Sequence, residues 1–277
     1  MWAVLMTALT YVFGGVPLKA LRSRDGRGIY WLISLLITGL LLIMRVRGLG
    51  IAFFSLVILI GFFSELEDLG FGFLLSSFLA LLMNTLIGAG AFALWVSATG
   101  PKWSGMVQSS LEMLLKPLTE INHAIQIDYS ELMMQLPSIV IILWMGSLYL
   151  AVLMERRLKG ASGRMRAQLG ELRLPDPVVW IFILALLGAF GGFEFRGVHS
   201  VSLNALNVCF VLFFFQGIAV VSRFFSRIQM GSFWQAVFMA LIVIHLFLFV
   251  SLLGLVDYWL DFRTRMSKGT PEYKREI

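Results

Sequence analysis

Long apolar segments recur along the whole chain, and short stretches with charged residues, glycine or proline separate them. A helix needs about 20 mostly apolar residues, within a range of roughly 17–25, to cross a bilayer. On this length, the pattern predicts an all-α, polytopic membrane protein with about eight membrane-spanning helices, within a range of roughly 7–9. The predicted spans are Trp2 to Leu18, Tyr30 to Met44, Ile51 to Phe63, Phe71 to Val96, Ser138 to Met154, Pro177 to Phe193, Leu203 to Val221 and Phe233 to Leu260.

Glycine marks several places where the predicted spans turn or break. Gly48 and Gly50 lie in the short connection between the second and third spans, which predicts a tight hairpin. The fourth span is long enough to tilt in the bilayer or to contain a break near residues 88–90. A re-entrant segment near residues 191–192 or near residue 197 is an alternative that would change the number of spans.

Residues 97–136 form a long polar interval between the fourth and fifth spans, and they are predicted to contain an amphipathic helix at the membrane interface. Trp103 is its expected anchor and Pro117 its expected stop, and a second short helix, Tyr129 to Met134, is expected before Pro137. The segment is either a lid over a cavity or a connector resting on lipid, and the connector is preferred. The apolar side comprises Val107, Leu111, Leu114, Leu115 and Leu118, and the polar side Gln108, Ser109, Glu112 and Lys116.

The composition agrees with a lipid environment for most of the chain. Hydrophobic residues make up 59%, charged residues 14%, and the mean hydropathy is +0.87, whereas soluble domains contain about 45–50% apolar and about 25% charged residues. A soluble fold of 277 residues has too little interior to bury this much apolar surface. One membrane domain covering residues 1–277 is therefore predicted, in contact with the lipid bilayer and with a polar tail at residues 262–277.

Basic residues gather in short clusters beside the predicted spans. A net charge of +6 would suggest a nucleic-acid partner for a soluble domain, but the flanks of membrane helices carry such clusters because they meet anionic headgroups. We therefore exclude nucleic acid as a partner. The two possible orientations place nearly equal numbers of the 22 Lys and Arg residues in cytoplasmic loops, so charge selects neither. The clusters are Lys19 to Arg27, Arg45 with Arg47, Arg156 to Arg166 and Arg263 to Arg275.

Recognisable motifs for catalysis, metal binding or nucleotide binding are missing from the sequence. His123, His199 and His245 lie far apart, and none has a second metal ligand at helical spacing. The glycine-rich stretch 188–192 lies inside an apolar span, where small residues favour close helix contact over phosphate binding. We expect no enzyme activity, no metal and no cofactor. An enzyme acting within the bilayer is the weaker alternative, and it would depend on His245.

Polar side chains inside predicted spans are costly in lipid, so they should face a cavity or another helix. Asn84, Asn207, Gln216 and His245 are the candidates for binding a small solute. An imidazole at membrane depth can relay a proton, bind a ligand or donate one hydrogen bond to a facing carbonyl, and the hydrogen bond is preferred for His245.

Small residues recur at intervals of four on two of the predicted spans. Such surfaces allow helices to approach closely, so packing within the chain is preferred over a ligand site or a seat for a partner subunit. The stripe on the fourth span comprises Ser76, Ala80, Asn84 and Gly88, and the stripe on the sixth span includes Ala185 and Ala189.

The second half of the sequence contains a pattern of polar and small residues within apolar text: Pro175-Asp176-Pro177, Asn207, Gln216 to Val221, Gly254 to Asp257, and Arg263. Over residues 137–265 this pattern is similar to the YybS-like family of uncharacterised bacterial multi-pass membrane proteins. That family distantly resembles the S components of energy-coupling-factor transporters and the rod-shape protein MreD. The resemblance implies a helical membrane domain in the bacterial cytoplasmic (inner) membrane, with either a small-molecule pocket or a scaffolding role.

The sequence departs from the S components in its first span. S components usually carry an Ala-xxx-Ala docking pattern there, whereas in this chain Ala3 is followed four residues later by Thr7, with Ala8 one place beyond. A small-xxx-small surface remains, but it differs from the docking pattern.

Two hypotheses for function follow. The first is a non-catalytic, solute-binding transport subunit of the S-component type, with a pocket near Asn84, Asn207, Gln216 and His245. The second is a structural subunit, similar in role to MreD, that packs against other membrane protein subunits and binds no small ligand. Polar residues that converge on one cavity would favour transport, and scattered polar residues would favour packing.

Overall fold

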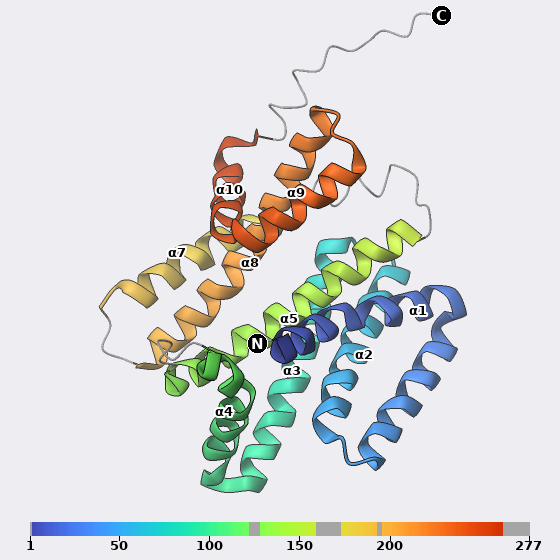
Figure 1. Ribbon diagram of the computed structural model, residues 1–277, viewed down its shortest axis with the longest axis vertical. Coiled ribbons are helices and arrows are strands. Elements are labelled where there is room, and N and C mark those ends of the chain that lie inside the picture. The colour runs from blue at the N-terminus through green and yellow to red at the C-terminus, as the bar shows by residue number, and fades with distance from the viewer. Residues whose placement is uncertain (1, 122–127, 159–172, 193–195, 263–277) are drawn as a thin grey trace, which may run out of the picture. The chain divides into compact units, whose positions relative to one another are not determined.

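The computed structural model describes residues 2–121, 128–158, 173–192 and 196–262 (Figure 1). All regular structure in these residues is helical, which confirms the all-α class. The short 3-10 helix η1 (Gly100–Lys102) joins α3 to α4. The α-helices are α1 (Trp2–Ile43), α2 (Arg47–Asp68), α3 (Phe73–Thr99), α4 (Trp103–Ile121), α5 (Tyr129–Leu158), α7 (Asp176–Phe190), α8 (Arg196–Arg227), α9 (Ser232–His245) and α10 (Phe247–Leu260).

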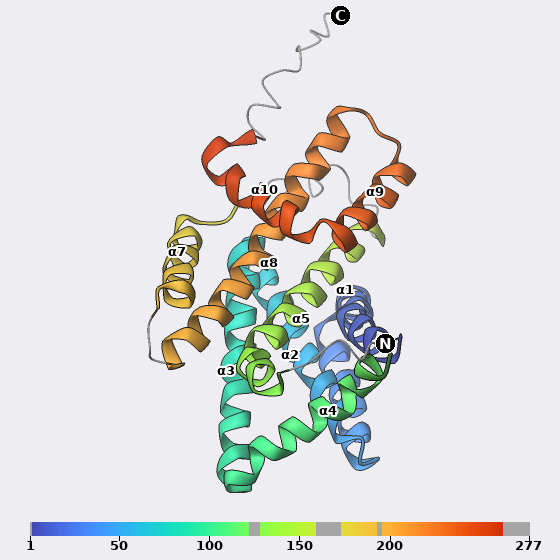
Figure 2. The same cartoon turned by 60° about the vertical axis from the view of Figure 1, so that its left-hand side comes forward.

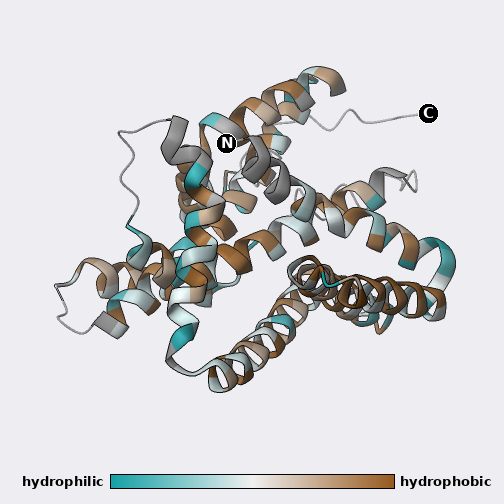
Figure 3. Ribbon diagram, turned by 60° about the horizontal axis from the view of Figure 1, so that its bottom comes forward, coloured by the Kyte–Doolittle hydropathy of each residue, from teal (hydrophilic) through white to brown (hydrophobic). Residues whose placement is uncertain are grey.

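Five of the described helices are long and apolar enough to cross a membrane, namely α1, α2, α3, α5 and α8. The pair α9 and α10 is bent by 101° and counts as a sixth span if taken together, and α7 is a shorter apolar helix. Figure 3 shows apolar residues along most of the described helices. The chain is therefore a polytopic helical membrane protein.

Within the described residues, each of the eight predicted spans lies mainly on helix, but the structure joins and breaks them differently. Phe193, the predicted end of the sixth span, lies outside the described residues. The first two predicted spans lie on the single helix α1, which is kinked at Gly26, a residue with φ 87° and ψ 177°. The eighth is broken where α9 ends at His245 and α10 begins at Phe247. The basic residues between the first two spans are themselves helical, so these spans form the two halves of one kinked helix.

Proline does not end helices in the interfacial segment, contrary to the prediction. α4 continues past Pro117 to Ile121, and the predicted short helix from Tyr129 is the first part of α5, which continues through Pro137. Membrane helices tolerate proline because neighbouring groups compensate for the missing hydrogen bond. Next to Pro137, the buried Ser138 hydroxyl donates to the carbonyl of Gln135 at 2.8 Å.

The chain divides into two compact units, Met1–Gly160 and Ala161–Ile277, and each is described by itself. In unit 1, α1, α2 and α5 pack together and α3 packs on α2. Figure 1 and Figure 2 both show the second half of α1 beside α2. Trp31 lies against Gly61, and Leu42 lies against Gly50, so these two segments are antiparallel. The buried core includes Tyr30, Leu56, Val57, Leu59, Ile60, Phe63, Trp144, Leu148 and Val152.

In unit 2, α7 and α10 both pack on α8. The Phe182 ring of α7 makes edge-to-face contacts with Phe210 and Phe213 of α8, with ring centroids 5.5 and 5.4 Å apart. Gly188 lies against Ser202, so α7 runs antiparallel to the first half of α8. The buried core includes Leu174, Val179, Phe182, Ala185, Leu206, Cys209 and Phe213.

Candidate functional site

Gln216 is the centre of a buried hydrogen-bond cluster in unit 2. Its side-chain oxygen accepts a hydrogen bond from the backbone N–H of Leu174 at 3.1 Å. Its amide nitrogen donates to the carbonyl of Gly254 at 3.0 Å and to Oδ2 of Asp257 at 3.3 Å. Gln216 is 0% exposed and Asp257 is 1% exposed. The amide therefore joins α8, α10 and the residue that precedes α7 by two positions.

Two glycines place α8 and α10 in direct backbone contact at this cluster. A Cβ added to Gly217 would lie 2.0 Å from the carbonyl oxygen of Val250. One added to Gly254 would lie 1.9 Å from the carbonyl oxygen of Phe213 and 2.7 Å from the Gly217 nitrogen. Only glycine allows helices to approach this closely. The crossing explains why the Gln216 side chain reaches the Gly254 carbonyl.

Polar contacts also fasten the two ends of unit 2 that flank this cluster. The Tyr258 hydroxyl of α10 donates to Oδ1 of Asp176 at 3.0 Å, and Arg173 forms an ion pair with Asp261. The hydrogen bond and the negative charge of Asp261 raise the pKa of the Arg173 guanidinium above its ordinary value. The start of α7 and the end of α10 are therefore held together.

The four predicted solute-binding residues occupy different surroundings. Gln216 is in the buried cluster, and Asn207 lies nine positions earlier on α8, about 13 Å away along the helix axis. His245 is exposed at the end of α9, and its Nδ1 lies 3.2 Å from the carbonyl oxygen of Leu241 in the same helix. Asn84 is buried on α3 in unit 1. The solute-binding role of these residues stays a prediction.

The predicted packing residues lie mostly on buried helix faces. Ser76 and Ala80 are buried together with Asn84 on α3, and a Cβ at Gly88 would meet the Trp144 ring at 3.4 Å. Ala185 and Ala189 are buried on α7. These placements support packing within each unit as the role of both stripes.

A buried ion cluster around Lys19 in unit 1 was not predicted from the sequence. Lys19 is 4% exposed, and its ammonium group lies 2.6 Å from Oε2 of Glu67 and 3.6 Å from Oε2 of Glu155. It also donates to the Ser64 hydroxyl at 3.1 Å and lies 4.8 Å from the centroid of the Phe63 ring. Lys19 therefore joins α1, α2 and α5.

A second group of ion pairs extends this cluster along α1. Arg22 pairs with Asp68 and, at 3.5 Å, with Glu65, and Arg27 pairs with Glu65 at 3.0 Å. The sequence contains a pattern from which this cluster could have been predicted. A basic run, Lys19 to Arg27, follows the first predicted span, and an acidic run, residues 64–68, follows the third. Because charges near lipid require partners, these two runs could be expected to pair.

A polar contact between the same three helices lies deeper in unit 1. The Tyr11 hydroxyl bonds to the Ser55 hydroxyl at 2.6 Å, and the Trp144 indole N–H donates to Tyr11 at 2.9 Å and to Ser55 at 3.3 Å. Each of these groups finds its partner on a neighbouring helix. The contact therefore satisfies polar groups within the bundle.

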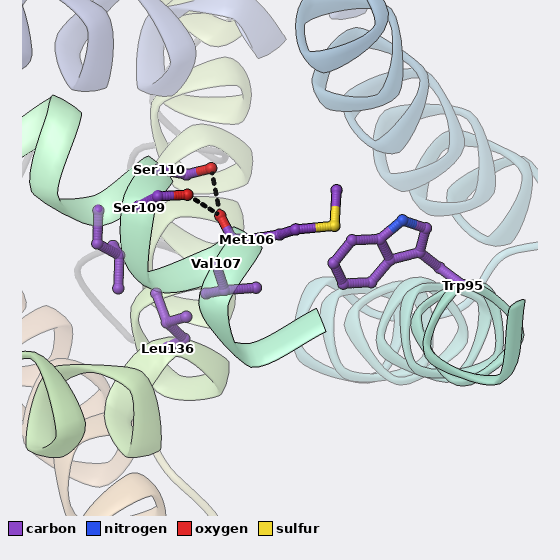
Figure 4. Close-up of a pocket in the computed structure, with 7 residues that line it drawn as sticks. Trp95, Met106, Val107, Ser109, Ser110 and Leu136 are labelled. Carbon is purple, nitrogen blue, oxygen red and sulfur yellow. Dashed lines mark hydrogen bonds between the residues drawn. The ribbon is translucent and has the colours of Figure 1, made fainter. Parts of the chain in front are cut away.

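An open groove of about 410 Å³ lies where α3, α4 and α5 meet (Figure 4). Both serine hydroxyls in its wall donate to the carbonyl of Met106, at 3.1 Å from Ser109 and 2.8 Å from Ser110. The groove therefore presents a mainly apolar surface. Its wall comprises Trp95, Met106, Val107, Ser109, Ser110, Leu111 and Leu136.

Among the residues that the structure describes, no cluster of three or more His, Cys, Asp or Glu side chains could hold a metal ion. His123, one of the three histidines weighed above, lies outside the described residues. The polar chemistry that the structure presents is that of hydrogen bonds and ion pairs between helices.

The helices and their buried polar contacts define a multi-pass α-helical membrane protein. The chain belongs to the DUF2232 family, described as predicted membrane proteins, whose model matches residues 3–258. The match covers both units. It gives no support to the predicted resemblance to the YybS-like family, the S components or MreD. No curated protein and no solved structure matches the chain.

Proposed function

We propose that this chain is a non-catalytic structural subunit of a larger protein complex in the bacterial cytoplasmic membrane. The observation that carries the proposal is that the Gln216 side chain is occupied by hydrogen bonds within the chain. This deeply buried amide makes three hydrogen bonds, and all three go to the chain's own helices and to Leu174. A solute site would need such donors and acceptors to face a cavity.

The Lys19 cluster and the Tyr11 contact support the same role in unit 1. Both use polar side chains to join α1, α2 and α5. Interhelical hydrogen bonds and ion pairs of this kind fix which helices are neighbours. Helices joined in this way suit a protein that holds others in place.

α3 offers a surface for a partner helix. Unit 1 buries a narrow stripe of α3, whereas all positions from Ala89 to Leu94 are exposed, and most of them are small. Small residues allow a second helix to approach closely in lipid, where the hydrophobic effect does not drive association. We assign this end of α3 to contact with another membrane polypeptide.

Site-specific photo-cross-linking in native membranes tests this assignment. A photoreactive amino acid at Ala91 should cross-link to a distinct polypeptide. The control is the same amino acid at Leu36, which is 65% exposed on α1 and should react with lipid. Cross-linking of both positions to lipid alone would remove the support that α3 gives to a structural role.

The groove beside α4 favours a second candidate, a solute-binding transport subunit of the S-component type. Its volume lies in the roughly 300–1,000 Å³ range of ligand pockets, and α4 supplies five of its seven lining residues. The wall has few free polar groups, so the solute would be mainly apolar.

Thermal unfolding of the purified protein with a panel of vitamins, amino acids, nucleobases and apolar metabolites tests this second candidate. Binding to the folded state raises the unfolding temperature by mass action. A rise in unfolding temperature that Met106→Ser abolishes would support solute binding in the groove. The absence of any rise across the panel would leave the structural role as the supported one.

A further inference from the structure

The ion cluster around Lys19 shows which helix ends of unit 1 lie together. Lys19 lies in the first half of α1, Glu67 in the last turn of α2 and Glu155 in the last turn of α5, and all three side chains meet. We call this the charged end of unit 1. The turn at residues 44–46 and the segment from η1 to the start of α5 lie toward the opposite end, because α2, α3 and α5 connect the two.

The first half of α1 runs parallel to α2 and α5. Tyr11 contacts Ser55 and Trp144, and Lys19, eight positions later, contacts Ser64 and Glu155. The chain thus advances toward the charged end on all three helices. The amino terminus of α1 is therefore directed toward the opposite end.

Basic residues are more numerous at the charged end. The positive-inside bias is counted over Lys and Arg in short loops and within about 15–20 residues of the span ends, and Asp and Glu contribute little to it. The helices and turns at the charged end contribute Lys19, Arg22, Arg24, Arg27, Arg156 and Arg157, and the opposite end contributes Arg45, Arg47, Lys102 and Lys116.

We infer that the charged end of unit 1 faces the cytoplasm and that α4, with its groove, lies on the external side of the membrane. Exposed cations at the charged end, such as Arg24 and Arg27, then meet the anionic headgroups of the cytoplasmic leaflet. The count over the whole sequence gave no orientation because it included the basic tail. Because the ion pairs show which helix ends of unit 1 lie together, the Lys and Arg residues of unit 1 can be counted separately.

Labelling of single cysteines with a membrane-impermeant maleimide tests the orientation. The one native cysteine, Cys209, is buried and is replaced by alanine in the full-length chain. Gly28→Cys marks the charged end and Gly105→Cys the opposite end. These two positions are matched, because both are exposed glycines at which an added Cβ meets nothing within 4 Å. Gly48→Cys, which shares these properties, is a second marker of the opposite end.

In intact cells whose outer barrier is open to the reagent, Gly105→Cys and Gly48→Cys should react, and Gly28→Cys should react only after the cytoplasmic membrane is permeabilised. The reverse pattern would overturn the inference, and so would equal labelling of both ends in intact cells. Labelling in denaturant confirms that each variant is present. A variant that reacts only in denaturant is replaced by its exposed neighbour at the same end, Asp25→Cys or Ser104→Cys.

Discussion

At the scale of the residue, buried polar groups decide which helices are neighbours. Lys19 is only 4% exposed, and its ammonium group lies beside Glu67 and Glu155 and donates a hydrogen bond to Ser64. Removing one partner of a buried pair leaves the other charge uncompensated, which destabilises far more than replacing both. Substitutions at such residues therefore report on the packing of whole helices.

Lys19→Met should lower the free energy of unfolding by about 1–3 kcal/mol. The loss is smaller than the roughly 3–5 kcal/mol of a fully buried pair, because Glu67 is 32% exposed and solvent screens its charge. Unfolding in detergent micelles measures it. Lys102→Met, at an exposed position, is the control and should change stability by no more than about 0.5 kcal/mol. Equal stabilities of the two variants would contradict a structural role for the cluster.

Gln216→Leu should destabilise the protein by about 1–3 kcal/mol, because it removes the amide that satisfies Leu174 N–H and the Gly254 carbonyl. The measurement is unfolding of the purified protein without any added solute. Gln108→Leu, on the exposed side of α4, is the matched control and should have little effect. A Gln216→Leu protein as stable as the wild type would mean that this amide does not hold unit 2 together.

Gly254→Ala should separate α8 from α10, because its Cβ would lie 1.9 Å from the Phe213 carbonyl oxygen. Overpacking of this kind costs about 1–3 kcal/mol. Gly90→Ala provides the comparison, because this exposed glycine of α3 has nothing within 4 Å of an added Cβ and alanine is the better helix former. Unfolding temperatures should fall for the first variant and stay level or rise for the second. Equal temperatures would rule out the close helix crossing.

At the scale of the element, the kink in α1 determines how unit 1 closes. Gly26 has φ +87°, a conformation that L side chains rarely adopt, and it allows the second half of α1 to return beside α2. Without this reversal, Arg27 and Trp31 would not reach Glu65, which forms an ion pair with Arg27 and accepts a hydrogen bond from the Trp31 indole N–H. One residue therefore sets the direction of a 17-residue helical segment, residues 27–43.

Gly26→Ala should destabilise unit 1 by about 1–2 kcal/mol, the strain of a left-handed conformation for a residue with a Cβ. Gly28→Ala, two positions later, is the matched control, because both sites are open to an added Cβ and only Gly26 has a positive φ. Unfolding in detergent compares the two. If Gly26→Ala were as stable as Gly28→Ala, the kink would not depend on glycine.

Within the described residues, the apolar pattern was sufficient to show where the long apolar helices lie, because a span needs a long apolar run wherever it lies. It could not distinguish a helical kink from a loop at Gly26, since charged residues interrupt apolar text in both cases. Nor could it show that α4 and α5 continue through Pro117 and Pro137. Whether proline ends a helix depends on the neighbouring groups, and these come from other parts of the fold.

The candidate polar residues were only partly predictable for a similar reason. Hydropathy alone singled out Gln216, because an amide inside an apolar run is conspicuous. Its partners, Leu174 and Asp257, are 42 and 41 positions away in sequence and depend on how α8 and α10 cross. Lys19 was assigned to a loop because it is charged, and its burial became visible only with Glu67 and Glu155 in place.

At the scale of the whole molecule, both units use their polar side chains to join their own helices. In unit 1 the ion cluster and the Tyr11 contact join α1, α2 and α5, and in unit 2 Gln216 joins α8 to α10. The small residues near the end of α3 are exposed, and the proposed role assigns them to contact with a partner. These features support a structural membrane subunit more strongly than a solute carrier.

The mass of the particle extracted from native membranes under gentle conditions tests this account most directly. A structural subunit should be recovered in a particle well above the 31.1 kDa of the chain, with at least one other polypeptide identified in it by native mass spectrometry. Less of the other polypeptide should remain bound to the chain when Ala91 on the exposed face of α3 is replaced by a bulky residue. Recovery of the chain alone, as a monomer in every detergent, would contradict the structural role.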